Sequence, residues 1–195
     1  MNKQKYQFTN IIPNETAASE VYPSRTLEIQ HQGKLSSSID VRDVGNSRPL
    51  YTIKTKTFKP QLTFTSCSDN QTLAIVEHHN FSRKIDITLR GQSTTIKPER
   101  KPKSTYTYTS PTTSAVLTWK FDRWTSMDMV CLDERGMALA RFRYAEWTMT
   151  KLGTLEIVGH AAAGGQMFEE LVVTCVTVVD HWQREAVAGA AAAVA

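Results

Sequence analysis

The sequence is poor in cysteine and has no long hydrophobic run. Its three cysteines, Cys67, Cys131 and Cys175, are widely separated and odd in number. This spacing excludes paired zinc ligands and a disulfide framework, so we interpret them as the reduced thiols of an intracellular protein. No stretch reaches the roughly 18 apolar residues of a membrane span. The opening MNKQKYQFTN lacks the apolar core of a secretion signal. We therefore expect a cytoplasmic protein that reaches membranes only at their surface.

Charge of either sign is also modest. The chain of 195 residues has 23 Lys and Arg against 19 Asp and Glu, a formal net charge of +4. Acids and bases are interspersed, whereas nucleic-acid-binding proteins usually concentrate basic residues on one face. The composition thus argues against nucleic acid as a partner. A chain of this length is typical of one globular domain, and we expect a monomer.

Short alternating apolar segments dominate the middle of the chain. Ile85, Ile87 and Leu89, for example, fall on one face of a predicted strand. About ten such segments occur at regular spacing, which is typical of an all-β barrel or sandwich. The clearest lie at 50–58, 72–79, 84–90, 115–121, 127–134, 137–144 and 154–159. Weaker hints at 26–48 leave open whether that stretch joins the sheet.

The two ends of the chain differ from the middle. Residues 1–25 are polar and aperiodic, so we expect a disordered tail. The globular domain is predicted over 26–185. Residues 186–195 are almost wholly alanine and valine, and form a low-complexity tail that either frays or prolongs the preceding element.

The apolar block FEELVVTCVTVVDHW at 168–182 is the exception among the strands. Seven β-branched side chains at 171–179 suit a buried strand. Against this, Glu169 and Glu170 stand where a first helical turn favours anions, and apolar residues recur at i, i+3 and i+4. The residues favour a helix over about 167–185 and leave the strand as an alternative. A helix so apolar must be buried, and a curled sheet would contain it.

Six phrases of the chain resemble a known group of proteins. They are YTIKTKTFKPQLTF at 51–64, SRKIDITLRG at 82–91, STYTYTSPTT at 104–113, LTWKFDRW at 117–124, DMVCLDERGMALARF at 128–142 and GTLEIVG at 153–159. The stretch from about 50 to 182 resembles an uncharacterised fungal family of the tubby C-terminal-like superfamily, which includes phospholipid scramblases and LURP-one-related proteins. The resemblance implies a mainly β fold, an antiparallel barrel of ten to twelve strands around the C-terminal helix. It implies no activity.

No residue constellation indicates catalysis or a metal site. His78 and His79 are adjacent in a predicted strand, so their side chains point to opposite faces. Asp133 and Glu134 belong to a predicted turn, and we expect them to be structural. The sequence has no G-x-S-x-G elbow and no phosphate-binding glycine loop. We therefore expect a protein that is not an enzyme and has no cofactor and no metal.

One loop is dense in positive charge. It contains Lys97, Arg100, Lys101 and Lys103, opposed only by Glu99. A solvated hairpin loop is the plain interpretation, and the functional one is a site for anionic headgroups. Four further residues are candidate additions to this site: Arg90, Lys120, Tyr106 and Tyr108. The aromatic residues Trp119, Phe121, Trp124 and Trp147 are interpreted as core rather than as a ligand cavity.

These observations favour a non-enzymatic binding module that docks on anionic phospholipid, such as a phosphoinositide, through the basic loop. Tubby domains bind phosphatidylinositol bisphosphate through basic residues, but that site does not align with particular positions of this chain. The alternative is a protein-interaction or scaffold domain with no role at lipid.

Overall fold

The computed structural model describes residues 24–33, 37–56, 61–79, 83–99, 105–122, 127–146 and 150–194. The predicted disordered tail, 1–25, lies outside these residues apart from its last two, which begin the first strand. The strands are β1 Ser24–His31, β2 Ser38–Asp43, β3 Tyr51–Lys56, β4 Gln61–Ser66, β5 Thr72–His78, β6 Ile85–Leu89, β7 Gln92–Pro98, β8 Thr105–Thr109, β9 Val116–Phe121, β10 Met129–Leu132, β11 Ala138–Tyr144 and β12 Lys151–Val158. A 3-10 helix, Gly159–Ala163, leads into α1, Gln166–Val194.

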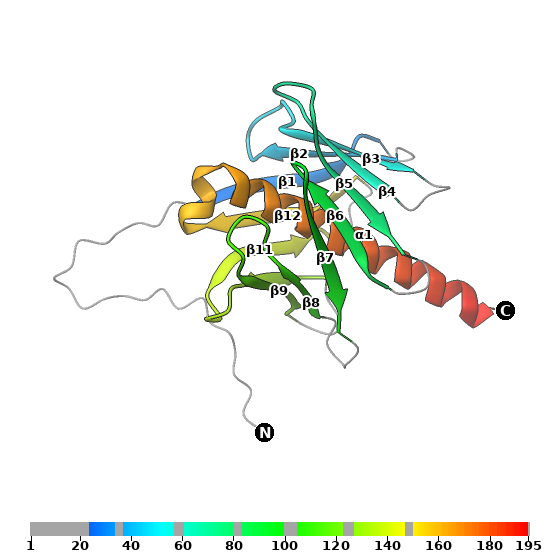
Figure 1. Cartoon of the computed structure of the whole chain (residues 1–195). Coiled ribbons are helices and arrows are strands. Elements are labelled where there is room, and N and C mark those ends of the chain that lie inside the picture. Colours follow the sequence, from blue (N-terminus) through cyan, green and yellow to red (C-terminus); the bar gives the residue numbers. More distant parts are fainter. Residues whose placement is uncertain are drawn as a thin grey trace, which may run out of the picture.

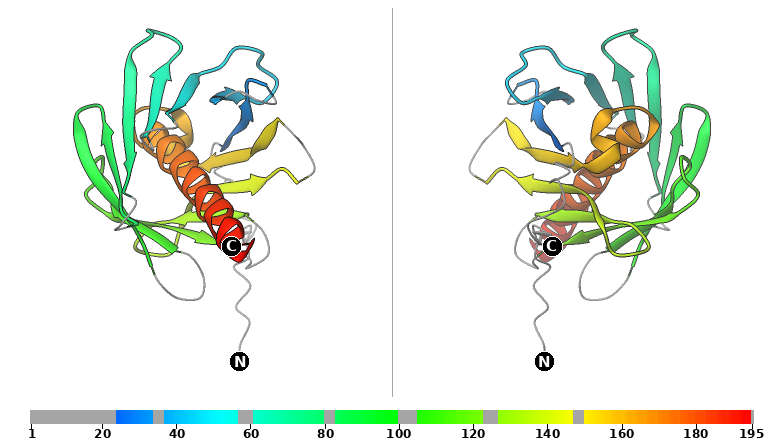
Figure 2. Two further views of the ribbon diagram at one scale, coloured as in Figure 1. Left: turned by 90° about the vertical axis from the view of Figure 1, so that its right-hand side faces the viewer. Right: turned by 90° about the vertical axis from the view of Figure 1, so that its left-hand side faces the viewer.

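In the described part of the chain, twelve strands form one closed antiparallel barrel. Each strand pairs with its neighbours in sequence, and β1 closes the ring by pairing with both β2 and β12. Figure 2 shows the strands arranged around a single helix. The mainly β barrel around a C-terminal helix, predicted from the sequence, is confirmed.

Residues 26–48, where the strand signals in the sequence are weak, close the barrel. Leu27, Ile29 and Val41 are buried in the core, while the residues between them on β1 face outward. Leu27 lies opposite Leu155 of β12 and Asp43 of β2. Residues 26–48 therefore join the barrel, which answers the question that the sequence left open.

The helix α1 occupies the barrel interior. Residues 168–179 are all buried, so the helix presents apolar surface to strands on every side. The hydroxyls of Thr174 and Thr177 donate to the carbonyls of Glu170 and Val173, at 2.8 and 2.7 Å. Those bonds satisfy the two threonine hydroxyls inside the apolar core. The block at 168–182 is thus a helix and not a strand.

The helix is longer than the predicted 167–185. It continues through the Ala-rich segment to Val194 and leaves the barrel after about residue 185 (Figure 1). Alanine has the highest helix propensity of all residues, so the segment prolongs the helix. At 1.5 Å per residue, the nine residues beyond Glu185 extend about 13 Å from the barrel. Val187 in this segment is 71% exposed.

Aromatic side chains fill the space between the strands and α1. Trp119, Tyr106 and Phe142 are fully buried, and Phe121 is nearly so. The core role predicted for Trp119 and Phe121 is confirmed, while Trp124 and Trp147 lie outside the described residues. Tyr106 and Tyr108 share the interior face of β8, so neither adds to a surface site near the basic loop.

The hairpin between β6 and β7 fixes the start of α1. The turn of this hairpin is Arg90-Gly91, with φ of 47° and 80°. Two positive φ values are typical of a two-residue turn whose twist matches the strands. This turn directs the Arg90 guanidinium to Glu169, with two nitrogen–oxygen distances of 2.6 Å. Arg90 therefore lies at the opposite end of β7 from the basic loop and does not belong to it.

Candidate functional site

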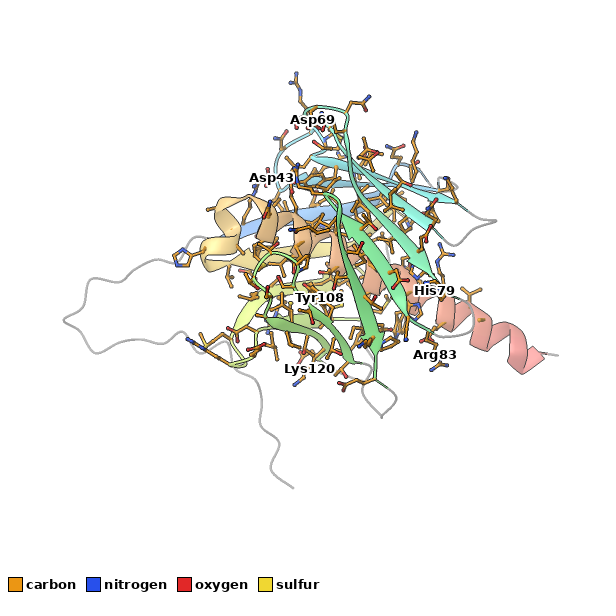
Figure 3. The ribbon with its side chains drawn as sticks, viewed as in Figure 1. Asp43, Asp69, His79, Arg83, Tyr108 and Lys120 are labelled. Carbon is orange, nitrogen blue, oxygen red and sulfur yellow. The ribbon has the colours of Figure 1, made fainter. Side chains whose placement is uncertain are left out.

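One end of the barrel brings together the residues where α1 leaves the core. We call it the helix-exit end and define it by His78, Arg83, Asp180, His181 and Glu185. Figure 3 shows Arg83 and His79 beside the emerging helix. The two histidine rings of the definition, from β5 and α1, stack with centroids 5.6 Å apart and planes 4° apart. The end of β5 therefore meets the helix here.

A chain of charged contacts holds the helix in this position. His78 Nε2 lies 3.0 Å from Asp180 Oδ2, and Arg184 Nε donates to the same oxygen at 2.6 Å. Arg83 Nε lies 3.3 Å from Glu185 Oε1, and His181 Nε2 lies 3.7 Å from that oxygen. Burial alone would raise the pKa of Asp180, but its contacts with His78 and Arg184 outweigh burial and lower it. Asp180 is therefore held as a carboxylate by Arg184, which donates to it, with the His78 ring beside it.

His181 is held as a neutral ring. Burial lowers its pKa below the ordinary value; Glu185 and Asp180 act in the opposite direction, and His78 and Arg83 add to the lowering. The ring also meets Tyr106 edge-on, with centroids 5.8 Å apart. Protonation of His181 therefore opposes folding.

This arrangement predicts acid sensitivity. As pH falls below about 6.5, the unfolded chain takes up a proton at His181, whereas the folded protein resists it. The free energy of unfolding should therefore decrease as pH falls from about 7.5 to 5.5, until pH passes the lowered pKa. Urea unfolding across this range tests the expectation. His181→Gln, which cannot titrate, should flatten the decrease, and His160→Gln, at an exposed position, should leave it unchanged. Equal slopes for His181→Gln and the wild type would contradict the assignment.

The basic loop begins beside the helix-exit end. Lys97, the penultimate residue of β7, is exposed there, whereas Arg100, Lys101 and Lys103 lie outside the described residues. Ile85 pairs with Ile96, so one further step in register places Lys84 opposite Lys97. Lys120 of β9, which Figure 3 labels, pairs with Thr105, and Thr105 directly follows the loop. Lys120, which the sequence suggested as an addition to this site, and Lys84, which it did not, thus flank the loop.

The acid within the loop is already engaged. Thr105 Oγ1 donates to Glu99 Oε2 at 2.7 Å, and the Glu99 backbone N–H donates to the Thr105 carbonyl at 2.8 Å. These bonds fix the points where the chain leaves β7 and enters β8. Because like charges opposite each other repel, Lys84 and Lys97 favour an anion between them.

A groove opens between β7 and β8 next to these lysines. Among the described residues, these strands pair only at Lys97 with Thr107 and at Pro98 with Tyr106. Beyond that point the Thr94 hydroxyl donates to the Thr109 carbonyl at 2.7 Å, and we call the groove along this stretch the open seam. Hydroxyl-bearing residues dominate its lining, with Lys84, Asp86 and Lys97 at one end. The sequence showed no sign of this groove, since it arises from missing strand pairing.

The other candidate residues have structural partners. His79 Nε2 lies 2.6 Å from Asp86 Oδ2, on the outer face, while His78 points inward as the alternation predicted. Asp133 Oδ1 accepts from the backbone N–H groups of Arg135 and Met137, as expected of a turn residue. Glu134 Oε1 accepts from the Val116 backbone N–H at 2.7 Å.

The three cysteines are free. Cys131 and Cys175 are buried, and burial raises the pKa of both thiols, which fits packing rather than reactivity. Cys67 is exposed, with Sγ 3.5 Å from Thr52 Oγ1. Among the described residues, no three His, Cys, Asp or Glu side chains gather to hold a metal ion.

Residues 35–185 match a family described as a family of unknown function, DUF6593. The chain belongs to that family. No curated protein and no solved structure matches it. The DUF6593 match runs from just before β2 to the point where α1 leaves the barrel, so it contains the basic loop, the open seam and the helix-exit end. The tubby-like and fungal affiliations implied by the resemblance stay predictions. Within the described part of this DUF6593 member, no helix has both the length and the hydropathy needed to cross a bilayer.

Proposed function

We propose that this protein is a non-enzymatic binding module that docks on anionic phospholipid, such as a phosphoinositide, through Lys97, Arg100, Lys101 and Lys103. The observation that carries the proposal is the position of Lys97. It is exposed at the end of β7, opposite Lys84, and the chain re-enters the barrel next to Lys120. Lys84, Lys97 and Lys120 therefore lie next to the two ends of the loop, and the loop's acid, Glu99, is engaged by Thr105.

The charge of this region suits a membrane surface better than a small-molecule site. Each basic residue near an anionic surface contributes about 1 kcal/mol, and the contribution is screened by salt within a Debye length. Four such residues give about 4 kcal/mol, a factor of several hundred in the binding constant. No buried pocket is required for binding of this kind.

Liposome co-sedimentation tests the proposal. We expect pelleting with vesicles containing phosphatidylinositol bisphosphate, none with phosphatidylcholine alone, and loss of binding at high salt. Changing Lys97, Arg100, Lys101 and Lys103 to Ala together should weaken binding about a hundredfold or more. The matched control removes four exposed charges elsewhere, at Arg48, Lys54, Arg135 and Arg143, and should weaken it far less.

Two results would count against lipid docking. Equal losses in the loop variant and the control variant would mean that net charge, and not the loop, governs pelleting. An absence of pelleting with either vesicle would favour the alternative, a protein-interaction domain, whose partner would be sought by pull-down.

A further inference from the structure

The helix α1 changes from buried to exposed within a few residues at the helix-exit end. Residues 168–179 are all buried, 182–185 are half-buried and 186–189 are exposed. The first group is enclosed by the barrel, whereas the residues after Asp180 touch it on one side only. The end of the helix therefore rests against the barrel through a small number of side-chain contacts.

One of these contacts joins the helix to β5 and to the chain that follows it. The His78 ring of β5 stacks on the His181 ring and lies 3.0 Å from Asp180 Oδ2. Arg83 Nε lies 3.3 Å from Glu185 Oε1, but 62% of the Arg83 side chain is exposed. Exposed ion pairs of this kind contribute little to stability. The histidine stack is therefore the buried part of the contact.

The stack buries polar atoms that the protein does not satisfy. Both ring nitrogens of His78 and the Nε2 atom of His181 are buried, and none of them forms a hydrogen bond with a described residue. Buried polar groups without hydrogen-bond partners destabilise the arrangement that buries them. Separation of β5 from the helix would expose these nitrogens to water. The contact is therefore poised between a closed and an open arrangement.

Charged groups from both sides of the contact act on a proton at His181. Burial opposes the proton most strongly, and His78 and Arg83 oppose it as well, whereas Glu185 and Asp180 on the helix favour it. The pKa of the ring is lowered as a result. An exposed histidine titrates near 6.5. The open arrangement therefore binds a proton more readily than the closed one.

The third neighbour of the His181 ring is Tyr106 of β8, which meets it edge-on with centroids 5.8 Å apart. Burial raises the pKa of Tyr106, so this side chain stays uncharged in the range where histidine titrates. Tyr106 pairs with Pro98, the last residue of β7, after which the basic loop continues. The histidine stack therefore lies beside the start of the basic loop.

We propose that the stack of His78 on His181 is a proton-operated switch between β5 and the end of α1. With a neutral His181 ring the stack is closed. A proton from solvent places a buried positive charge against His78 and Arg83, and the two elements separate. Residues 168–179 stay inside the barrel, so the change is local. The switch requires no lipid and is tested without it, so its outcome is independent of the proposed docking.

Hydrogen exchange on the unchanged protein tests the switch. A short helical segment without tertiary contacts is marginal in water, so opening should allow the amides of residues 181–185 to exchange. After correction for the intrinsic pH dependence of exchange, their protection should fall about five- to tenfold between pH 7.5 and 5.5, which is the effect of one proton. The amides of residues 172–178 should stay better protected at every pH.

Urea at concentrations well below the unfolding midpoint separates local opening from unfolding of the domain. Unfolding exposes a large surface, so urea strongly accelerates exchange by that route, whereas a local opening responds little. Exchange at residues 181–185 should therefore be almost independent of urea. If urea accelerates exchange at 181–185 as much as at 172–178, the proton acts only through unfolding of the whole domain, and the switch is overturned.

Two variants assign the proton to the stack. His181→Gln cannot titrate, so the fall in protection at residues 181–185 should shrink to less than about twofold. His79→Gln is the matched control, because His79 is adjacent to His78 on β5 but contacts Asp86 on the outer face. This control should keep the full pH dependence. A full pH dependence in His181→Gln, or its loss in both variants, would contradict the assignment. The measurements on the unchanged protein decide the question if His181→Gln does not fold.

Discussion

Val176→Asp should abolish the folded state of this protein. Val176 is 1% exposed on α1, deep inside the barrel. It lines, with Ile29, Ile39 and Phe142, a cavity of only about 10 Å³, at the lower limit for one water molecule. A carboxylate there has no solvent and no cation, and Asp180 lies one turn away on the same helix. Removing one partner of a buried ion pair already costs about 3–5 kcal/mol, and a carboxylate placed with no partner in an apolar core costs more, which brings the loss to the total stability of about 5–15 kcal/mol of a typical domain.

Two companion variants make this result specific to burial. Val187→Asp introduces the same charge on the same helix, but at a side chain that is 71% exposed, so it should change stability by less than about 0.5 kcal/mol. Val176→Thr keeps the shape, and its hydroxyl can donate to the Val172 carbonyl as Thr174 and Thr177 do to theirs. It should cost about 1 kcal/mol. Circular dichroism with urea unfolding measures all three. A soluble Val176→Asp protein with a normal unfolding curve would contradict the buried helix.

The apolar block at 168–182 shows how far the fold can be predicted from the sequence. Its seven β-branched residues lower helix propensity and favour a strand. The spacing of its apolar residues favours a helix. Burial decides between them, since valine and threonine side chains pack well in a core and the two threonine hydroxyls find partners within the helix. Neither the packing nor these hydrogen bonds depend on helix propensity. Whether the segment forms a strand or a helix therefore depends on the residues that surround it in the fold.

The strands were predictable where one face is buried and the other is exposed. Ile85, Ile87 and Leu89 alternate in the sequence and are all buried. The pairing that closes the barrel was not predictable, because β1 and β12 lie at opposite ends of the chain and no local pattern states which strands pair. The weak signals at 26–48 therefore turned out to belong to strands that complete the ring.

Some features of the candidate sites can be predicted from the sequence, and others depend on contacts between distant residues. Charge density identified the basic loop from composition, but the approach of Lys84 to Lys97 depends on the β6–β7 register. The contact of His78 with Asp180 joins residues about a hundred positions apart. The open seam lies where β7 and β8 pair at only two positions among the described residues, and no local sequence pattern indicates it. Sequence reasoning therefore found the charged loop and missed the sites that depend on how distant strands and α1 come together.

Trp119→Ala should be the most destabilising single truncation in the barrel wall. Trp119 is 0% exposed, and its indole N–H donates to Thr174 Oγ1 on α1 at 3.0 Å. Tyr108 approaches the same oxygen at 3.5 Å, and Thr174 in turn donates to the Glu170 carbonyl. Removing the indole leaves a large cavity between β9 and the helix, which costs about 3–5 kcal/mol.

A graded series separates ring volume from the hydrogen bond. Trp119→Phe keeps most of the apolar contact and loses the N–H donor, so it should cost about 1–2 kcal/mol. Thr118→Ala, on the opposite face of β9 and half-buried, should cost less than about 1 kcal/mol. If Thr174→Val is combined with Trp119→Phe, the two costs should not add, because both remove the same bond. Additive costs would mean that the indole holds the helix by packing alone, and a Trp119→Ala protein as stable as Thr118→Ala would mean that α1 is anchored elsewhere, at Arg90 with Glu169 or at His78 with Asp180.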